Sequence, residues 1–309
     1  MTTNQQGMSI LIPCHNEQGN IELLIQEIEQ ECRLNPTINV EVIWIDDASV
    51  DSGFSMKAMF PENHKIIKNY RKLGQSLSIS RGFNMAKYDL IGILDGDTQN
   101  VPTDLFDFCK IMREFPEVDM IQGRRLVRND TLVRRFPSRI ANRLIRMISK
   151  APFNDLGCGT KILRRDLCRK IPFRGEIHRI YALHAYMGGY NVLEKNVKHR
   201  PRKFGKSKYG LKRLFKLIVD ILFLRFKFAI TEKPIYVFGG ISLGMLIISF
   251  LMFFAAIILR ITNIKDYLDG ALVIGSIVLL ITAILTIFIS FVLEIILQKI
   301  SVITNELKN

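Results

Sequence analysis

The sequence predicts an α/β domain followed by a membrane anchor of two helices, and three observations lead to this fold class. Short apolar runs of strand length alternate with segments of helix length over residues 8–200. Acidic or polar residues directly follow several of these apolar runs. Towards the carboxyl end, two long runs contain no charged residue at all. The first two features are typical of an α/β domain with a binding edge, and the third indicates membrane spans.

The expected strands lie within residues 8–16, 40–47, 64–70, 89–97 and 118–125. Helices are expected over residues 17–34, after Asp51, over residues 75–87 and after Pro102. This alternation predicts βαβ units and a parallel sheet. Ligands of such sheets bind at the carboxyl ends of the strands. The binding site is therefore expected at that edge.

The strand ends carry carboxylates where many nucleotide-binding folds carry glycines. No G-x-G-x-x-G follows the first strand and no G-x-x-x-x-G-K-[ST] occurs, which disfavours dinucleotide-binding and P-loop proteins. Instead, Asp46-Asp47 ends one strand and Asp95-Gly96-Asp97 ends another. Carboxylates beside a phosphate ligand need a bridging cation, and hard oxygen ligands select Mg²⁺ or Mn²⁺.

The chain is strongly basic, with 43 Lys and Arg against 29 Asp and Glu, for a net charge of +14. Such a charge predicts a polyanionic partner: nucleic acid, anionic membrane or a phosphorylated substrate. Residues 124–150 contain nine basic residues and one acidic residue. A helical stripe of basic residues lies there beside an apolar stripe, which favours contact with an anionic membrane over a solvated face. Its members are Arg135, Arg139, Arg143, Arg146 and Lys150. The five cysteines contain no C-x-x-C pair and are expected to be reduced thiols.

Two membrane spans are expected near the carboxyl end, and no signal peptide is expected at the start. The first uncharged run, from Pro234 to Leu259, has 26 residues, and the second extends from Gly270 to Leu293. A helix of the first length rises about 39 Å, enough to cross a hydrocarbon core of about 30 Å. Residues 195–233 contain 13 Lys and Arg. The loop between the spans, counted together with Arg260 before it, contains only two basic residues. The positive-inside rule therefore places the large amino-terminal part and the carboxyl-terminal tail in the cytoplasm.

The segment before the first span predicts a helix that lies in the plane of the lipid headgroups. Arg213, Lys216, Asp220 and Lys227 form one narrow polar stripe on a mostly apolar helix. A helix packed on the soluble domain is the alternative. The expected parts are a domain over residues 1–207, this juxtamembrane region over 208–233, two spans over 234–300 and a cytosolic tail over 301–309.

Taken in order, the motifs resemble glycosyltransferases of family 2, which have the GT-A, or nucleotide-diphospho-sugar transferase, fold. The similarity is to its polyprenyl-phosphate glycosyltransferases, such as dolichyl-phosphate mannose synthase and the bacterial undecaprenyl-phosphate sugar transferases. It is carried by residues 12–21, 44–53, 69–102, 121–125 and 199–210. The two carboxyl-terminal spans also resemble the bacterial subgroup.

The resemblance implies roles for residues that match the family's motifs. It implies that Asp95, Asp97 and Gln99 hold Mg²⁺ or Mn²⁺ on the donor diphosphate, and that Asp97 and Asp155 serve the reacting centre. The other implied positions are Pro13, Glu17, Asp46 and Asp47 for the donor nucleotide, Arg125, Arg134 and Ser138 for the acceptor phosphate, and Arg202, Ser207 and Lys208 for a lid on the diphosphate. Two motifs depart from the family. Gly159-Thr160-Lys161 stands where Gly-Phe-Arg is frequent, and Cys14-His15 stands where Val-Tyr is common.

The activity that the resemblance implies is an inverting, metal-dependent sugar transfer from a nucleotide sugar, with a UDP-sugar favoured, to polyprenyl phosphate such as undecaprenyl phosphate. The product would be a polyprenyl-monophosphate sugar for modification of envelope glycans. Expected partners are the nucleotide sugar, the polyprenyl phosphate and the lipids of a bacterial-type cytoplasmic membrane, with no nucleic acid. Because relatives include tetramers, a homo-oligomer is also expected by analogy.

Two alternatives remain open at the level of sequence. A family 2 transferase acting on a glycolipid hydroxyl usually has a Q-x-x-R-W motif, but the only tryptophan here is Trp44, within an expected strand. A membrane-anchored protein that binds RNA or lipid without catalysis would explain the charge. It would leave the paired carboxylates unexplained, since carboxylates repel phosphate unless a metal lies between them.

Overall fold

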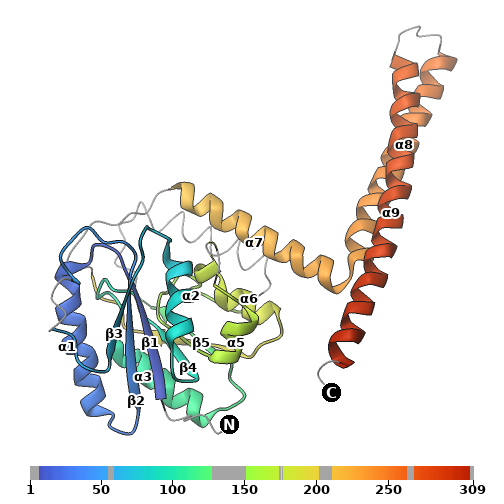
Figure 1. The fold of residues 1–309 in the computed structure, drawn as a ribbon. Helices are drawn as coiled ribbons and strands as arrows, with labels where there is room; N and C mark the ends of the chain where they lie inside the picture. Colours follow the sequence, from blue (N-terminus) through green and yellow to red (C-terminus); the bar gives the residue numbers. More distant parts are fainter. Residues whose placement is uncertain are drawn as a thin grey trace. The chain divides into compact units, whose positions relative to one another are not determined.

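The computed structural model describes residues 7–54, 59–126, 151–173, 175, 177–201, 211–262 and 268–306. The chain divides into two compact units, Met1–Leu222 and Phe223–Asn309. The first unit is an α/β domain and the second is built from long helices (Figure 1).

The strands of the first unit form one seven-stranded sheet with the order β3-β2-β1-β4-β6-β5-β7. The strands are β1 (Gly7–Cys14), β2 (Asn39–Asp46), β3 (His64–Lys68), β4 (Leu90–Ile93), β5 (Met120–Arg125), β6 (Lys161–Arg164) and β7 (Val192–Val197). The helices are α1 (Gln18–Leu34), α2 (Gln75–Met85), α3 (Pro102–Glu114), α5 (Arg165–Lys170), α6 (Tyr181–Met187) and the short 3₁₀ helix η2 (Ile177–Arg179).

The strand β6 makes the sheet mixed, so the expectation of a parallel sheet is wrong at this position. β6 pairs antiparallel with both β4 and β5, whereas β1, β2, β3 and β4 pair in parallel. The strand β5 ends at the carboxyl edge, and β6 begins at the same edge and therefore runs in the opposite direction. Position 161 therefore lies at the edge where the parallel strands end, opposite Gln122.

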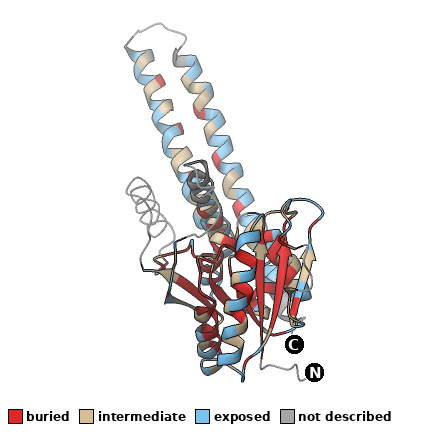
Figure 2. Ribbon diagram, turned by 90° about the vertical axis from the view of Figure 1, so that its left-hand side faces the viewer, coloured by how far each residue is buried: buried red, intermediate tan, exposed pale blue. Residues whose placement is uncertain are grey.

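Alternating side chains of β1 divide the core between the two faces of the sheet. Met8, Ile10 and Ile12 pack with apolar residues of α1 and α3 on one face. Leu11 faces α2 on the other, where it approaches Gly82. Figure 2 shows that the buried residues concentrate in the sheet and on the inner sides of these helices. The layered core fixes the strand ends, and with them the polar residues that follow.

Two further expectations differ from the structure at their boundaries. Of the helix expected after Asp51, the described residues 51–54 form a turn instead. The tail expected over 301–309 is the continuation of the last helix, which ends at Glu306. The basic helix expected within 124–150 lies, for residues 127–150, outside the described part of the chain.

The second unit contains two helices that are long and apolar enough to cross a membrane, α8 (Pro234–Ile261) and α9 (Leu268–Glu306). They run antiparallel along each other (Figure 1). Most of their surface is not buried, as expected of helices that face lipid. The helix α7 (Leu211–Glu232) precedes them and spans the division between the units.

A seam of small residues joins α8 and α9. The buried small residues recur every seven positions, as Ser242, Ser249 and Ala256 on α8 and as Ser276, Ala283 and Ser290 on α9. The Oγ of Ser249 donates a hydrogen bond of 2.7 Å to the carbonyl of Ser276. Small side chains allow the backbones of apolar helices to approach closely, so this seam holds the pair together.

Candidate active site

Three adjacent strands end in strained backbone at one edge of the sheet. The residues Asn16, Ala48 and Thr98 follow β1, β2 and β4 and have φ values of 58°, 57° and 58°. Positive φ is uncommon for residues other than glycine, and such strain concentrates at binding and catalytic sites. The coincidence of all three at the carboxyl edge identifies this edge as the candidate site.

The two carboxylates that follow β2 have different surroundings. Asp47 accepts hydrogen bonds from Asn69 Nδ2 at 2.9 Å, Leu73 N at 2.7 Å and Gly74 N at 2.8 Å. Burial acts to raise the pKa of Asp47, but these hydrogen bonds outweigh it and lower the pKa below its usual value. Asp47 therefore holds the loop between β3 and α2 in place.

Asp46 is the carboxylate of this pair with fewer internal contacts. Its Oδ1 accepts the main-chain N–H of Ser49 at 2.8 Å, and its Oδ2 lies 3.9 Å from Nζ of the exposed Lys68. Of the other residues expected at the donor nucleotide, Pro13 pairs with Ile45 at the end of β1, and Glu17 accepts the side-chain amide of Asn20 at 2.7 Å. All of these residues lie at or just beyond the ends of β1 and β2.

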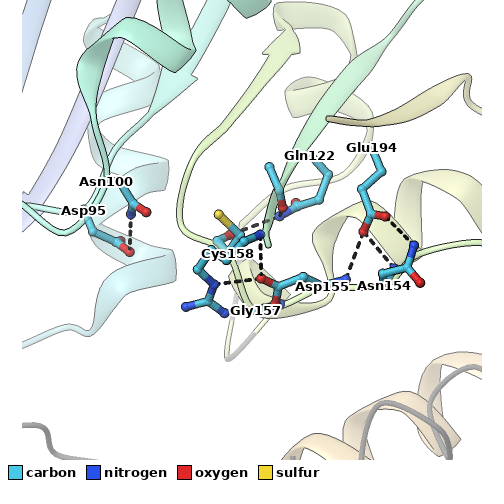
Figure 3. Close-up of polar contacts among 10 residues, drawn as sticks. Asp95, Asn100, Gln122, Asn154, Asp155, Gly157, Cys158 and Glu194 are labelled. Atoms are coloured by element: carbon cyan, nitrogen blue, oxygen red, sulfur yellow. Dashed lines mark hydrogen bonds and ion pairs between the residues drawn. The ribbon is translucent and has the colours of Figure 1, made fainter. Parts of the chain in front are cut away.

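The acidic motif after β4 is held by a network of its own. Asp95 Oδ1 accepts Gln75 Nε2 at 2.9 Å. Asp95 Oδ2 accepts Asn100 Nδ2 at 3.4 Å (Figure 3). Asp97 Oδ1 accepts the N–H of Gln99 at 3.2 Å. Burial, followed by the negative charge of Asp97, raises the pKa of Asp95. The charge of Asp97 thus disfavours the ionised form of Asp95.

The side-chain oxygen atoms at this turn fit a divalent cation that is bound together with a phosphorylated ligand. A cation between Asp95 and Asp97 would relieve their repulsion, and the buried Asn100 Oδ1 has no hydrogen-bond partner among the described residues. No three His, Cys, Asp or Glu side chains converge in the part of the chain that the structure describes. A cation here would therefore complete its shell with ligand oxygens, as Mg²⁺ and Mn²⁺ do on phosphates.

Gln99, expected as a third metal ligand, contacts Arg200 through its side-chain nitrogen. Its Nε2 donates to the main-chain carbonyl of Arg200 at 3.4 Å, and the main-chain carbonyl of Gln99 accepts the N–H of Arg200 at 2.8 Å. The next residue, Asn100, forms a β-bridge with His199. The acidic motif is thereby joined to the segment that leads to residues 202–210, and the expected lid residues Arg202, Ser207 and Lys208 lie outside the described residues.

Arg125 and Asp155, expected at the acceptor phosphate and the reacting centre, form a bidentate ion pair. Arg125 Nε donates to Asp155 Oδ2 at 2.7 Å and Nη2 donates to Oδ1 at 3.0 Å. The main-chain N–H of Arg125 also reaches Oδ2, at 3.2 Å. A bidentate pair fixes the plane of the guanidinium as well as its position. Arg134 and Ser138, expected beside Arg125, lie outside the described residues.

The structure adds residues that the sequence analysis did not assign to the site. Lys161, at the start of β6, is 3% exposed and donates from Nζ to the carbonyl of His178 at 2.7 Å. Burial lowers the pKa of Lys161 to about 8, even though Asp95 and Asp155 favour its charged form. The sequence did contain a signal for Lys161, because it stands at a position where the family's motif often has arginine. Gln75 and Glu194, which support the two acidic motifs, had no such signal because their partners are distant in the sequence.

Comparison with known proteins identifies the class of protein to which this fold and site belong. Residues 9–172 match the family described as glycosyl transferase family 2. The chain is 30% identical over 247 residues to dodecaprenyl-phosphate galacturonate synthase from Rhizobium johnstonii, covering 77% of this chain and 72% of the relative. It is also 30% identical over 257 residues to undecaprenyl-phosphate 4-deoxy-4-formamido-L-arabinose transferase from Photorhabdus laumondii, covering 82% of this chain and 77% of the relative.

Solved structures share the fold at low sequence identity. Glucosyl-3-phosphoglycerate synthase from Mycobacterium tuberculosis, solved with Mn²⁺, UDP-glucose and phosphoglyceric acid, superimposes with a TM-score of 0.58 at 16% identity, covering 71% of this chain and 79% of that one. Mannosyl-3-phosphoglycerate synthase from Rubrobacter xylanophilus gives a TM-score of 0.56 at 16% identity, covering 74% and 75%.

The chain belongs to glycosyl transferase family 2 and is a glycosyltransferase with a GT-A fold. The expected resemblance is confirmed, since the two relatives above are named for polyprenyl-phosphate sugar transfer. The roles expected of individual site residues remain predictions.

Proposed function

We propose that this enzyme transfers a sugar, with inversion, from a nucleotide sugar to polyprenyl phosphate and releases a polyprenyl-monophosphate sugar. One observation carries the proposal. The acidic turn at Asp95 and Asp97 lies at the same sheet edge as the Arg125–Asp155 pair, with the buried Lys161 between them in the strand order. An edge with both an acidic pair and cations suits two phosphorylated substrates, one bound through a metal and one through arginine.

A nucleotide-sugar donor, with UDP-sugar favoured, is supported by the strand ends of β1 and β2. Asp46, Pro13 and Glu17 gather where nucleotides bind in open α/β sheets. The similar synthase from Mycobacterium tuberculosis was solved with UDP-glucose and Mn²⁺. We assign the base and ribose to this part of the edge, and the diphosphate to the Asp95–Asp97 turn with Mg²⁺ or Mn²⁺.

The proposed chemistry needs no strong general base. An oxygen of the acceptor phosphate attacks the anomeric carbon from the face opposite the leaving group. The bond from that carbon to the diphosphate oxygen breaks, and the nucleoside diphosphate leaves with the electron pair. The acceptor phosphate is already ionised at neutral pH, so no proton has to be removed. Asp95 and Asp97 would hold a divalent cation at their turn, which would supply positive charge to the leaving diphosphate.

The protein's own residues provide position and charge. Arg125, held in plane by Asp155, binds an oxygen of the acceptor phosphate, and Asp155 orients that guanidinium. Lys161 adds a buried cation whose pKa, about 8, leaves it largely protonated at neutral pH. These groups align the two reactants and stabilise charge during transfer.

The helical unit supports a membrane location for the acceptor. We assign α8 and α9 as membrane spans and place the α/β domain and both termini in the cytoplasm, because basic residues crowd the side before the first span. The exposed apolar residues of α7, including Leu222, Phe223 and Phe226, support contact with the lipid interface. These features suit an acceptor whose phosphate is carried by a membrane lipid.

Incubation of the purified protein in detergent with undecaprenyl phosphate, Mn²⁺ and a panel of labelled nucleotide sugars tests the proposal. The expected product is a labelled lipid whose sugar is released by mild acid, as a glycosyl phosphate is. Transfer only to a glycolipid hydroxyl would contradict the acceptor. No transfer from any donor, together with RNA binding that weakens steeply with salt, would contradict the enzymatic proposal as a whole.

A further inference from the structure

The loop that contains Asp155 is held between side chains from two neighbouring strands. Gln122 on β5 and Glu194 on β7 are direct partners in the parallel pairing of these strands. Directly paired residues point to the same face of a sheet. Gln122 Nε2 donates to the carbonyl of Cys158 at 3.1 Å, and Glu194 binds the other end of the loop (Figure 3). Side chains of the sheet therefore hold both ends of the loop 154–158 by hydrogen bonds.

The carboxylate of Glu194 makes three contacts with the start of this loop. Its Oε1 accepts the main-chain N–H groups of Asn154 at 2.7 Å and of Asp155 at 2.9 Å. Its Oε2 accepts Nδ2 of Asn154 at 2.8 Å. All three contacts need an acceptor on Glu194, and its two carboxylate oxygens supply them.

The contacts continue from Glu194 to the guanidinium of Arg125. Glu194 fixes the main chain of Asp155, and the carboxylate of Asp155 accepts Nε and Nη2 of Arg125. A second bond, from Gly157 N to Asp155 Oδ1 at 3.2 Å, orients the same carboxylate. The plane of Arg125 is therefore set by an acidic residue on the edge strand β7, which the sequence separates from Asp155 by almost forty positions.

We propose that Glu194 is a positioning residue for sugar transfer, acting through Asp155 on Arg125. The proposal rests on the proposed function, in which Arg125 binds the acceptor phosphate. Removal of the carboxylate lets the turn at residues 154–155 shift, and Arg125 then rotates away from the orientation that the acceptor requires. The donor side should change little, because Glu194 holds only the start of this loop, whereas Gln122 still binds the carbonyl of Cys158, next to the Gly159 that lies against Asp95.

The test compares Glu194→Ala, Glu194→Gln, Asn154→Asp and the double variant Asn154→Asp/Glu194→Gln in full-length protein, with exposed Glu117→Gln as the control. Glu194→Ala is expected to lower kcat/KM for the lipid phosphate roughly 10- to 100-fold, as misplaced catalytic groups do, with the donor KM unchanged. Glu194→Gln keeps the oxygen that accepts both main-chain N–H groups and should retain most activity. Glu117→Gln should match the wild type.

The double variant tests the contact between Asn154 and Glu194 directly, and the unchanged donor KM separates positioning of the acceptor from a general loss of structure. Asn154→Asp alone places two carboxylates against each other and should be impaired. In Asn154→Asp/Glu194→Gln the amide of the new glutamine donates to the new aspartate, so activity should recover above that of Asn154→Asp alone. Hydrogen exchange of the peptide over residues 151–160 should accelerate in Glu194→Ala and remain slow in Glu194→Gln.

Three outcomes would overturn the role of Glu194: wild-type kinetics in Glu194→Ala, a loss confined to the donor KM, or no recovery in the double variant. A wild-type protein that transfers no sugar contradicts the proposed function itself, and the role of Glu194 falls with it. A Glu194→Ala protein that remains as active as an active wild type contradicts the role of Glu194 alone. The two failures are therefore distinguishable.

Discussion

Gly159 lies directly against the carboxylate of Asp95. A Cβ built at position 159 would overlap the carboxylate atoms of Asp95, so only glycine fits there without displacing the acid. The contact joins the chain that enters antiparallel β6 to the acidic turn after β4. The reversal of β6 therefore positions the first carboxylate of the acidic motif.

Gly159→Ala should reduce sugar transfer, because the new methyl group forces Asp95 away from Gln75 and Asn100. A displacement near 1 Å at a reacting centre costs on the order of 100-fold in rate. The measurement is kcat at saturating donor over a range of Mn²⁺ concentrations. Gly239→Ala is the control, since a Cβ there meets no atom within 4 Å. Equal activity in Gly159→Ala and wild type would show that Asp95 tolerates displacement.

Asp97→Ala should abolish transfer while membrane insertion persists. The variant removes one of two carboxylates available to a cation at this turn, but leaves α8 and α9 unchanged. Product formation and the membrane fraction are measured together, and Asp107→Ala on exposed α3 surface serves as the control. Full activity in Asp97→Ala, or in wild type with excess chelator, would contradict the metal-assisted mechanism.

Acid should destabilise the α/β domain through His178. Burial lowers the pKa of His178 to about 3 from the ordinary value of 6.5, so the folded state excludes a proton that the unfolded state binds. The stability from neutral His178 is present above pH 6.5 and is lost as pH falls towards 3. The variant His178→Gln lacks the titrating imidazole, so this contribution to the pH dependence of the free energy of unfolding is removed. From pH 7 to 4.5 the stability advantage of wild type should shrink by on the order of 2–3 kcal/mol.

The fluorescence of Trp44, the only tryptophan and fully buried in the sheet, reports this unfolding in urea. His178 Nδ1 lies 2.8 Å from Ser76 Oγ, a contact that glutamine can replace in part at neutral pH. Parallel pH profiles for the two proteins would show that other groups, such as His64, dominate the acid response.

Ala283→Leu should separate α8 from α9. Ala283 is fully buried in the seam, and a larger side chain there overpacks the contact at a cost of about 1–3 kcal/mol. Thermal unfolding of the helical unit, followed by far-ultraviolet circular dichroism in micelles, should shift to lower temperature. Ile284→Leu changes an exposed neighbour and should have little effect. An unchanged transition in Ala283→Leu would show that the helices do not pack through this seam.

The strand ends with their acidic pairs were predictable from sequence, because local patterns encode them. Alternating or continuous runs of apolar residues predict the strands β1, β2 and β4. The residues that directly follow a strand must lie at its carboxyl end. Asp46, Asp47, Asp95 and Asp97 were thereby placed on one edge. The two long apolar helices were equally predictable, since their length and their lack of charge are read directly from the local sequence.

The pairings across the sheet depended on the tertiary structure. No local pattern shows that β6 runs antiparallel, that Glu194 supports Asp155, or that Gln99 turns towards Arg200. These contacts join residues brought together by the strand order, and a strand's direction follows from the path of the loop before it rather than from its own residues. The sequence by itself determined which groups reach the edge, and the tertiary structure alone decided which of them hold one another in place.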